Sequence, residues 1–186
     1  MAATSRTTKP ESGFQYRKVS RETVKEIGQT LAGGENVVLL GPRYGGKSYV
    51  MKELSEALSA ARAAHCLLEL SEQEPIVSAI DLAVRIQYAA QRAGCKDAAS
   101  SGGVLQPLDQ LYETMERPVL LLVSTLEGMA HHLARHFLEQ VEQRMQAGRV
   151  VVALAADHYS RDLLSIADSA FPARHLFMLQ GFTEEE

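Results

Sequence analysis

Eight consecutive residues at positions 41–48, GPRYGGKS, have the composition and spacing of a loop that could hold phosphate groups. They match the pattern G-x-x-x-x-G-K-[ST], in which glycines let backbone N–H groups turn inward around an anion. The residues that follow read as a helix, whose N-terminus would add its partial positive charge at the same point. Lys47 would reach the outer phosphates of a nucleotide, and the Ser48 hydroxyl would be a ligand of Mg²⁺. The stretch therefore predicts a site for ATP or ADP with Mg²⁺.

The predicted nucleotide-binding residues are Gly41, Pro42, Arg43, Tyr44, Gly45, Gly46, Lys47, Ser48 and Tyr49. ATP is favoured over GTP because the chain has no Asn-Lys-x-Asp guanine motif. The alternative is a glycine-rich turn that binds nothing. An apolar run before the loop and a helical pattern after it favour the phosphate loop.

Alternating strand-like and helix-like segments must position this loop. Compact apolar runs, typical of parallel strands covered on both faces, lie at 36–40, 65–70, 118–123, 150–156 and 175–179. Amphipathic segments lie at 47–62, 75–93, 128–147 and 160–171. The alternation predicts an α/β domain of three layers, in which helices cover both faces of a five-stranded, mainly parallel sheet.

The ends and one internal segment of the chain have a different composition. Residues 1–13 are small and polar and predict a flexible N-terminal tail, so the core domain would cover 14–186. Ser20 is a plausible N-cap for a helix that stops near Gly33 and Gly34. Residues 94–107 carry Gly, Ser and Pro without periodicity and predict a mobile loop.

Several longer stretches resemble the AAA+ and STAND classes of P-loop ATPases. VSRETVKEIGQTLAGGENVVLLGPRYGGKSYVMKEL looks like the opening of the family, with its Arg-Glu pair at Arg21 and Glu22. GRVVVALAADHYSRDLL resembles the fourth strand, with the polar sensor position at Asp157, and RHLFMLQGFTEEE resembles the fifth strand and the start of a helical lid. The resemblance covers most of 14–186. It implies a P-loop NTPase fold with strand order 5-1-4-3-2, Phe14–Val19 near the adenine, and a lid outside this chain.

By the same resemblance PVLLLVSTLEG is the third strand, which in the family ends in an aspartate that holds magnesium and a glutamate that polarises water. Ser124 and Thr125 stand at those positions. A hydroxyl supplies neither a full charge nor much basicity, so we expect weak or absent hydrolysis. Glu127 could supply the acid, although a solvated acid in the first turn of the next helix is the more ordinary reading. Asp157 could supply it if the strand assignment were shifted by one. The candidate catalytic residues are Lys47, Glu127 and Asp157.

Other residues give weaker signals. His132 and His136 have the spacing of a zinc pair, but no third ligand is evident, and a half-exposed polar stripe that includes His131 is favoured over a metal site. Cys66 and Cys95 suggest reduced thiols in a cytoplasmic protein. No apolar run approaches the ~20 residues that a bilayer needs.

Composition and charge limit the classes of function. A chain of 186 residues with 46% hydrophobic residues fits one domain with its own core. A net charge of -4 gives no general basic surface, so nucleic acid is open as a partner but not indicated. The leading hypothesis is a regulatory ATP- or ADP-binding domain that works with other domains or proteins of a larger parent chain, and a homo-oligomer is compatible with it. The alternatives are an active ATPase that remodels a partner or loads onto DNA, and a nucleotide-free scaffold for protein interactions.

Overall fold

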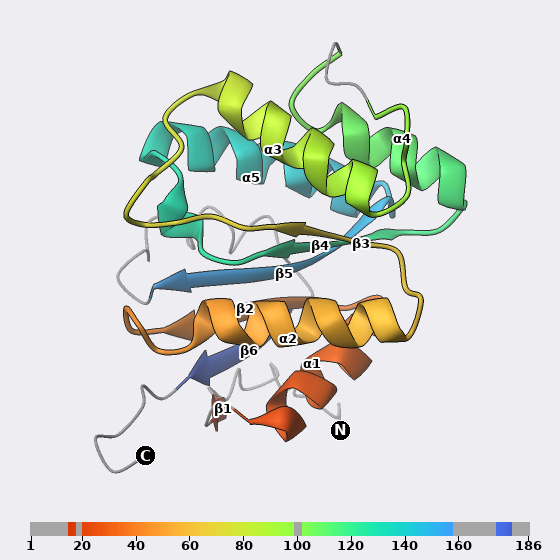
Figure 1. The fold of residues 1–186 in the computed structure, drawn as a ribbon. Helices are drawn as coiled ribbons and strands as arrows, with labels where there is room; N and C mark the ends of the chain where they lie inside the picture. The colour runs from red at the N-terminus through yellow and green to blue at the C-terminus, as the bar shows by residue number, and fades with distance from the viewer. Residues whose placement is uncertain (1–14, 18–19, 99–101, 158–173, 180–186) are drawn as a thin grey trace, which may run out of the picture.

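A single parallel sheet forms the centre of the protein. The computed structural model describes residues 15–17, 20–98, 102–157 and 174–179. Within these ranges the strand order is β1-β6-β2-β5-β4-β3 (Figure 1). The strands are β1 (Gln15–Arg17), β2 (Asn36–Gly41), β3 (His65–Leu68), β4 (Val119–Val123), β5 (Val150–Asp157) and β6 (Arg174–Leu179). Every pair of neighbours is parallel.

Five of these strands confirm the predicted sheet and its order, because 5-1-4-3-2 corresponds to β6-β2-β5-β4-β3. The strand β1 was not predicted. It pairs in parallel with β6 through three residue pairs, from Gln15 with Phe177 to Arg17 with Leu179. A strand of three residues is too short to show a hydrophobic period. It extends the sheet at the edge next to β6.

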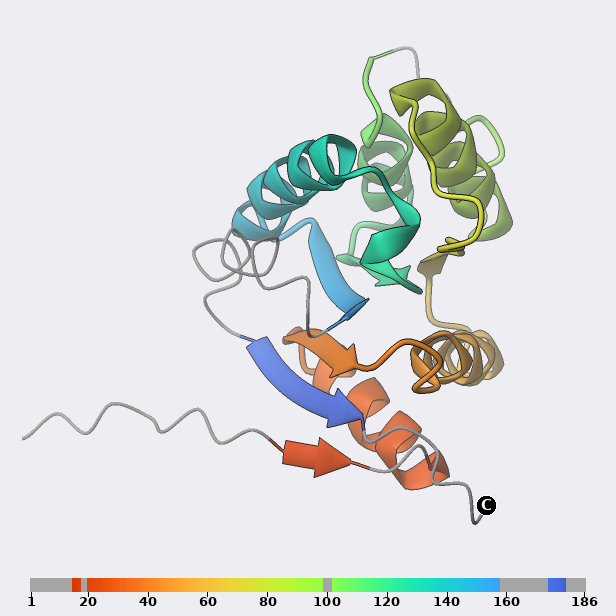
Figure 2. The same ribbon diagram turned by 90° about the vertical axis from the view of Figure 1, so that its left-hand side faces the viewer.

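Helices cover both faces of the sheet, as predicted (Figures 1 and 2). Helices α1 (Arg21–Ala32) and α2 (Lys47–Ala60) lie on one face, and α3 (Ala79–Arg92), α4 (Gln106–Met115) and α5 (His131–Gln146) on the other. Alternate residues of β2 enter the two separate cores, since Val37 and Leu39 pack with α1 and α2 while Val38 and Leu40 face the second core. The central strands are therefore buried on both sides, which explains their continuous apolar sequence.

The cap of α1 is confirmed. The Ser20 Oγ accepts a hydrogen bond from the Thr23 N–H at 3.2 Å, and the helix ends before Gly33. The predicted start of the second amphipathic segment near Pro75 is wrong, because α3 begins at Ala79 with Ser78 as its N-cap. Ile76 instead donates from its N–H to Gly128 O and accepts from the Ala130 N–H, both at 2.8 Å. These bonds hold the segment in an extended conformation, so it does not become part of the helix.

Helix α4 has no counterpart among the predicted elements and overlaps the end of the predicted loop at 94–107. Leu105, Leu108 and Leu111 are fully buried against the sheet and its neighbouring helices. The Gly, Ser and Pro residues before this helix masked a short apolar period. The predicted tail at 1–13, the helix at 160–171 and the start of the lid at 180–186 lie outside the described residues.

Candidate functional site

The glycine-rich segment forms a tight turn between the carboxyl end of β2 and the N-terminus of α2. Gly46 is the N-cap of α2 and has φ 82°, a left-handed conformation that glycine adopts without strain. Tyr44 also has a positive φ, 62°. A Cβ added to Gly45 would lie 2.9 Å from Pro42 O, closer than real Cβ atoms approach. Two of the predicted glycines are thus required by the shape of the turn itself.

Lys47 is the buried cation of this turn. Its side chain is only 4% exposed, and its Nζ donates to Gly41 O at 3.0 Å and to Pro42 O at 2.9 Å. No carboxylate of the described residues forms an ion pair with it. A lysine ammonium has three N–H donors, so one remains for a further acceptor. A buried positive charge held only by neutral carbonyls favours an anion beside it.

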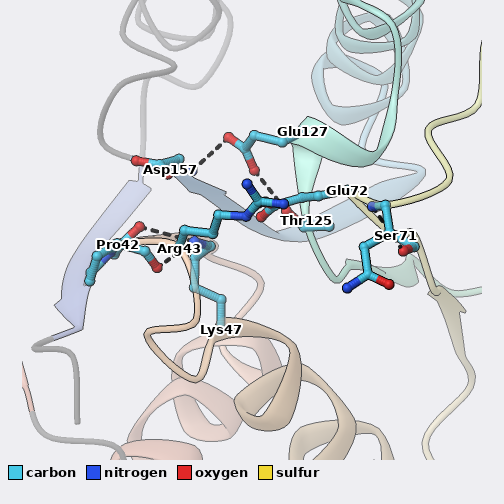
Figure 3. Close-up of polar contacts among 10 residues, drawn as sticks. Pro42, Arg43, Lys47, Ser71, Glu72, Thr125, Glu127 and Asp157 are labelled. Carbon is cyan, nitrogen blue, oxygen red and sulfur yellow. Dashed lines mark hydrogen bonds and ion pairs between the residues drawn. The ribbon is translucent and has the colours of Figure 1, made fainter.

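A cleft of about 430 Å³ opens over the turn. Its lining residues are Arg43, Tyr44, Gly45, Gly46, Lys47, Ser48, Tyr49, Leu70, Ser71, Glu72, Gln73 and Thr125. Arg43 Nε forms an ion pair with Glu72 Oε2 at 2.8 Å (Figure 3). The Arg43 guanidinium also lies 5.2 Å from the centre of the Tyr44 ring. The cleft therefore has a positive floor and one acidic residue at its margin.

Ser124 follows β4 and is almost completely buried. Its Oγ accepts a hydrogen bond from the Leu70 N–H at 2.8 Å and donates to Leu70 O at 3.3 Å. Its own N–H donates to Leu68 O at 3.1 Å. The hydroxyl thus acts as both donor and acceptor, and its two hydrogen bonds connect the end of β4 to the segment that follows β3.

Glu127 lies in the short 3-10 helix η1 (Leu126–Gly128) and bridges two strand ends. Its Oε2 accepts from Thr125 Oγ1 at 2.7 Å, and its Oε1 accepts from the Asp157 N–H at 2.6 Å (Figure 3). The carboxylate is therefore half-buried and engaged, which corrects the interpretation as a simple solvated acid in a helical first turn. Parallel pairing of β2 with β5 also sets Asp157 opposite Gly41. The fold brings Glu127, Asp157 and the glycine-rich turn to one edge of the sheet.

Sequence reasoning missed Glu72 and Leu70 as part of this site. Glu72 precedes the predicted helical segment at 75–93, and in the structure it pairs with Arg43 at the margin of the cleft. The contact between Leu70 and Ser124 joins positions 54 residues apart, so no local pattern could have revealed it.

Several of the predicted candidates lie away from the cleft or outside the described residues. His131, His132 and His136 are exposed on α5, and His136 contacts Gln140 and Glu139. The described part of the chain contains no group of three or more His, Cys, Asp or Glu that could hold a metal ion. Gln15–Arg17 of the segment expected near adenine forms the edge strand β1. In the portion that is described, every helix is too short or too polar to cross a bilayer.

Comparison with characterised sequences gives one relative. The chain is 29% identical to the zinc import ATP-binding protein ZnuC of Ruegeria pomeroyi in an alignment that covers 78% of this chain and 67% of that protein. No model of a known protein family matches the chain. The identity is enough to relate the chain to P-loop ATPases in general.

Comparison with solved structures places the fold. The Drosophila origin recognition complex bound to GC-rich DNA and Cdc6 contains a chain that matches with a TM-score of 0.59 at 11% identity, over 87% of this chain and 28% of that one. A Walker-type ATPase of Pyrococcus abyssi matches at 0.57, with 16% identity over 89% and 54%. Cdc6p of Pyrobaculum aerophilum matches at 0.56, with 14% identity over 97% and 49%. The chain thus has the fold of the P-loop ATPases and spans about half or less of these relatives' length.

Proposed function

We propose that this domain binds ATP or ADP, with Mg²⁺, in the cleft over residues 41–48 and hydrolyses it slowly or not at all. The observation that carries the proposal is the buried Lys47 ammonium at the N-terminus of α2, whose partners among the described residues are two backbone carbonyls. An anion is the ligand that such a site favours. The ATP-binding function named for the ZnuC relative agrees with this choice.

The residues present fit a phosphate group. A Cβ at Gly41 would lie 3.2 Å from Leu179 Cβ, and one at Gly45 would strike Pro42 O, so side chains there would fill or distort the turn. Lys47 would hold the outer phosphates with its remaining N–H donor, and the exposed Ser48 hydroxyl would supply an oxygen ligand to Mg²⁺. Mg²⁺ would neutralise part of the negative charge of the phosphates.

Weak hydrolysis follows from the end of β4. The Ser124 hydroxyl already makes two hydrogen bonds to Leu70 and carries no charge. Thr125 is buried and donates to Glu127. Neither residue can act as a base near neutral pH, and the metal would keep water ligands in place of a carboxylate.

A bound nucleotide that is rarely consumed suits a regulatory role. We infer that the domain works within a larger chain of the AAA+ or STAND type, in which unequal affinity for nucleotide would bias two arrangements of neighbouring segments. The free thiols Cys66 and Cys95 are consistent with the cytoplasm. The matching origin-recognition structure contains DNA, but a net charge of -4 gives this chain no general basic surface for nucleic acid.

Calorimetric titration of the full chain with ATP and Mg²⁺ tests binding. We expect saturable heat for the unmodified protein, a loss of about a hundredfold or more in affinity for Lys47→Ala, and no loss for Lys52→Ala, which removes an exposed lysine of the same helix. Absence of heat in the unmodified protein would contradict the proposal and favour a nucleotide-free scaffold.

A second candidate function is a working ATPase, and the position of Glu127 favours it. This carboxylate lies at the carboxyl edge between β4 and β5, where the ligands of open α/β sheets bind. Phosphate release by the unmodified chain and by Glu127→Gln and Asp157→Asn distinguishes the two functions. Turnover that Glu127→Gln abolishes would establish the ATPase, whereas background rates in all variants would support regulatory binding.

A further inference from the structure

Helix α3 exposes a continuous apolar stripe, which we define as Val77, Ile80, Val84 and Tyr88. Their exposed fractions are 65%, 75%, 57% and 63%. They are four of the six large apolar residues that the described part of the chain leaves exposed. The four-residue spacing of Ile80, Val84 and Tyr88 places them on one side of α3, and Val77 lies in the segment just before the helix. Leu82 and Ile86 of the same helix are buried in the core.

The stripe differs from scattered surface hydrophobes. α3 lies in the outer helical layer that covers one face of the sheet (Figures 1 and 2). A narrow row of apolar side chains on an exposed helix is the arrangement by which two helices associate along a seam. The feature is separate from the nucleotide cleft, since none of the four side chains lines it.

We propose that the stripe on α3 is a dimerisation surface at which a second copy of this chain packs its own α3 in the antiparallel direction about a two-fold axis at Val84. An antiparallel pairing centred there sets Val84 against Val84 of the second copy. It also sets Ile80 against Tyr88 in both directions. The stripe is therefore complementary to itself, as an interface with two-fold symmetry requires.

Charge complementarity decides the direction. With 100° of rotation per residue, Asp81 and Arg85 lie on the same flank of the stripe, and the glutamines Gln87 and Gln91 lie on the other. Antiparallel packing brings like flanks together, so Asp81 of one copy lies about 3 Å along the axis from Arg85 of the other. Arg85 has the same axial separation from Arg85 of the other copy, but Asp81 lies nearer the seam, at about 60° from Val84 against about 100° for Arg85, so the two Asp81–Arg85 pairs are the closer ones. Parallel packing would set these charges against glutamines instead. Arg85 is exposed and donates from Nη1 only to Glu69 O, so it can turn toward a second copy.

Sedimentation equilibrium of the full chain, over roughly a hundredfold range of concentration, tests the association. We expect the unmodified chain and Tyr49→Asp, which changes an exposed tyrosine of α2 outside the stripe, to dimerise equally. Val84→Asp should raise the dimer dissociation constant by about a hundredfold, because two carboxylates then face each other at the axis. Val84 is exposed, so the variant should fold, and circular dichroism checks this. A monomer at every concentration in the unmodified chain would overturn the proposal, as would equal loss in Tyr49→Asp.

A charge exchange tests the direction. Asp81→Arg and Arg85→Asp should each weaken the dimer, by about tenfold, because each sets like charges together twice. The double variant should recover the affinity of the unmodified chain. Failure of the double variant to recover would overturn the antiparallel arrangement.

A cysteine at the axis gives an independent measurement. Val84→Cys should form a disulfide between copies under mild oxidation, whereas Glu56→Cys, on the exposed side of α2, should not. The native thiols do not compete, because Cys66 and Cys95 are buried and burial raises the pKa of Cys66 to about 12. Equal cross-linking of the two variants would contradict the two-fold seam.

Discussion

At the scale of single residues, hydroxyls and carboxylates at the ends of β4 and β5 have structural partners. Ser124 fastens β4 to the segment after β3, and Glu127 joins Thr125 to the backbone of Asp157. These residues lie at the edge where a P-loop ATPase keeps its acids. Under the proposed function, these hydrogen bonds would account for a serine and a threonine at that edge.

Ser124→Ala tests the structural role of the hydroxyl. The substitution leaves the buried Leu70 N–H without its acceptor, so the free energy of unfolding should fall by about 1–3 kcal/mol. Urea unfolding followed by circular dichroism measures it. Ser59→Ala, at an exposed position of α2, is the matched control and should change stability little. An equal effect of both variants would contradict the role of the buried bond.

Cys66 gives a dependence of stability on pH. Burial raises the pKa of its thiol from 9.0 to about 12, with a smaller contribution from Cys95. The unfolded chain therefore ionises first, so this stabilisation is complete below pH 9.0 and is lost as the pH rises toward 12. The free energy of unfolding should fall by about 1 kcal/mol per pH unit through this window. Cys66→Ala should lower this slope, and an unchanged slope would contradict the assignment.

At the scale of elements, close approach of two backbones fixes η1. Gly128 lies against the chain at Leu70, since an added Cβ would be 2.5 Å from Leu70 Cβ. The N–H of Ile76 donates to Gly128 O in the same region. The position of Glu127, the neighbour of Gly128, depends on this contact.

Gly128→Ala should therefore destabilise the fold by about 1–3 kcal/mol, because the clash forces a backbone shift. Gly28→Ala is the matched control, since its Cβ would meet only Leu54 Cδ1, at an ordinary 3.5 Å, within α1. There alanine should raise stability by about 0.5–1 kcal/mol. Thermal unfolding of both variants measures the contrast, and a loss of the same size in both would refute the steric argument.

The elements that sequence predicts best are those with a long uniform pattern. β2, β4 and β5 are buried on both faces, and their apolar runs match the observed bounds within a residue or two. β1 and α4 were missed because three residues and a Pro-containing turn leave no clear period. The start of α3 was misplaced because its true cap, Ser78, follows a segment held by contacts with 128–130.

The candidate site likewise has one part that the sequence predicts and another part that it does not. The loop at 41–48 is continuous in sequence, and its spacing predicts the turn that the structure contains. The partners of Ser124 and Glu127 come from other strands, at separations of 54 and 30 residues. Such contacts depend on the order of the strands and on side-chain direction, which composition and period do not specify.

At the scale of the whole molecule, two apolar cores share one sheet, so a ligand at its carboxyl edge stabilises both. A ligand that binds the folded chain at a thousandfold excess over its dissociation constant adds about 4 kcal/mol to the free energy of unfolding. Saturating ATP with Mg²⁺ should raise the urea midpoint accordingly, and Lys47→Ala should remove the gain. Val84→Asp should retain it, because the stripe does not line the cleft. A gain in Lys47→Ala equal to that of the unmodified chain would place the nucleotide elsewhere.

The five residues from Ser71 to Pro75 form a loop that hydrogen bonds of the flanking residues hold in place at each end. Leu70 is tied to Ser124 on one side, and Ile76 is tied to Gly128 and Ala130 on the other. Glu72, which pairs with Arg43, lies within this loop. We therefore expect a disturbance at Glu72 to be confined to these five residues. Self-association through α3 should accordingly be indifferent to the contents of the cleft.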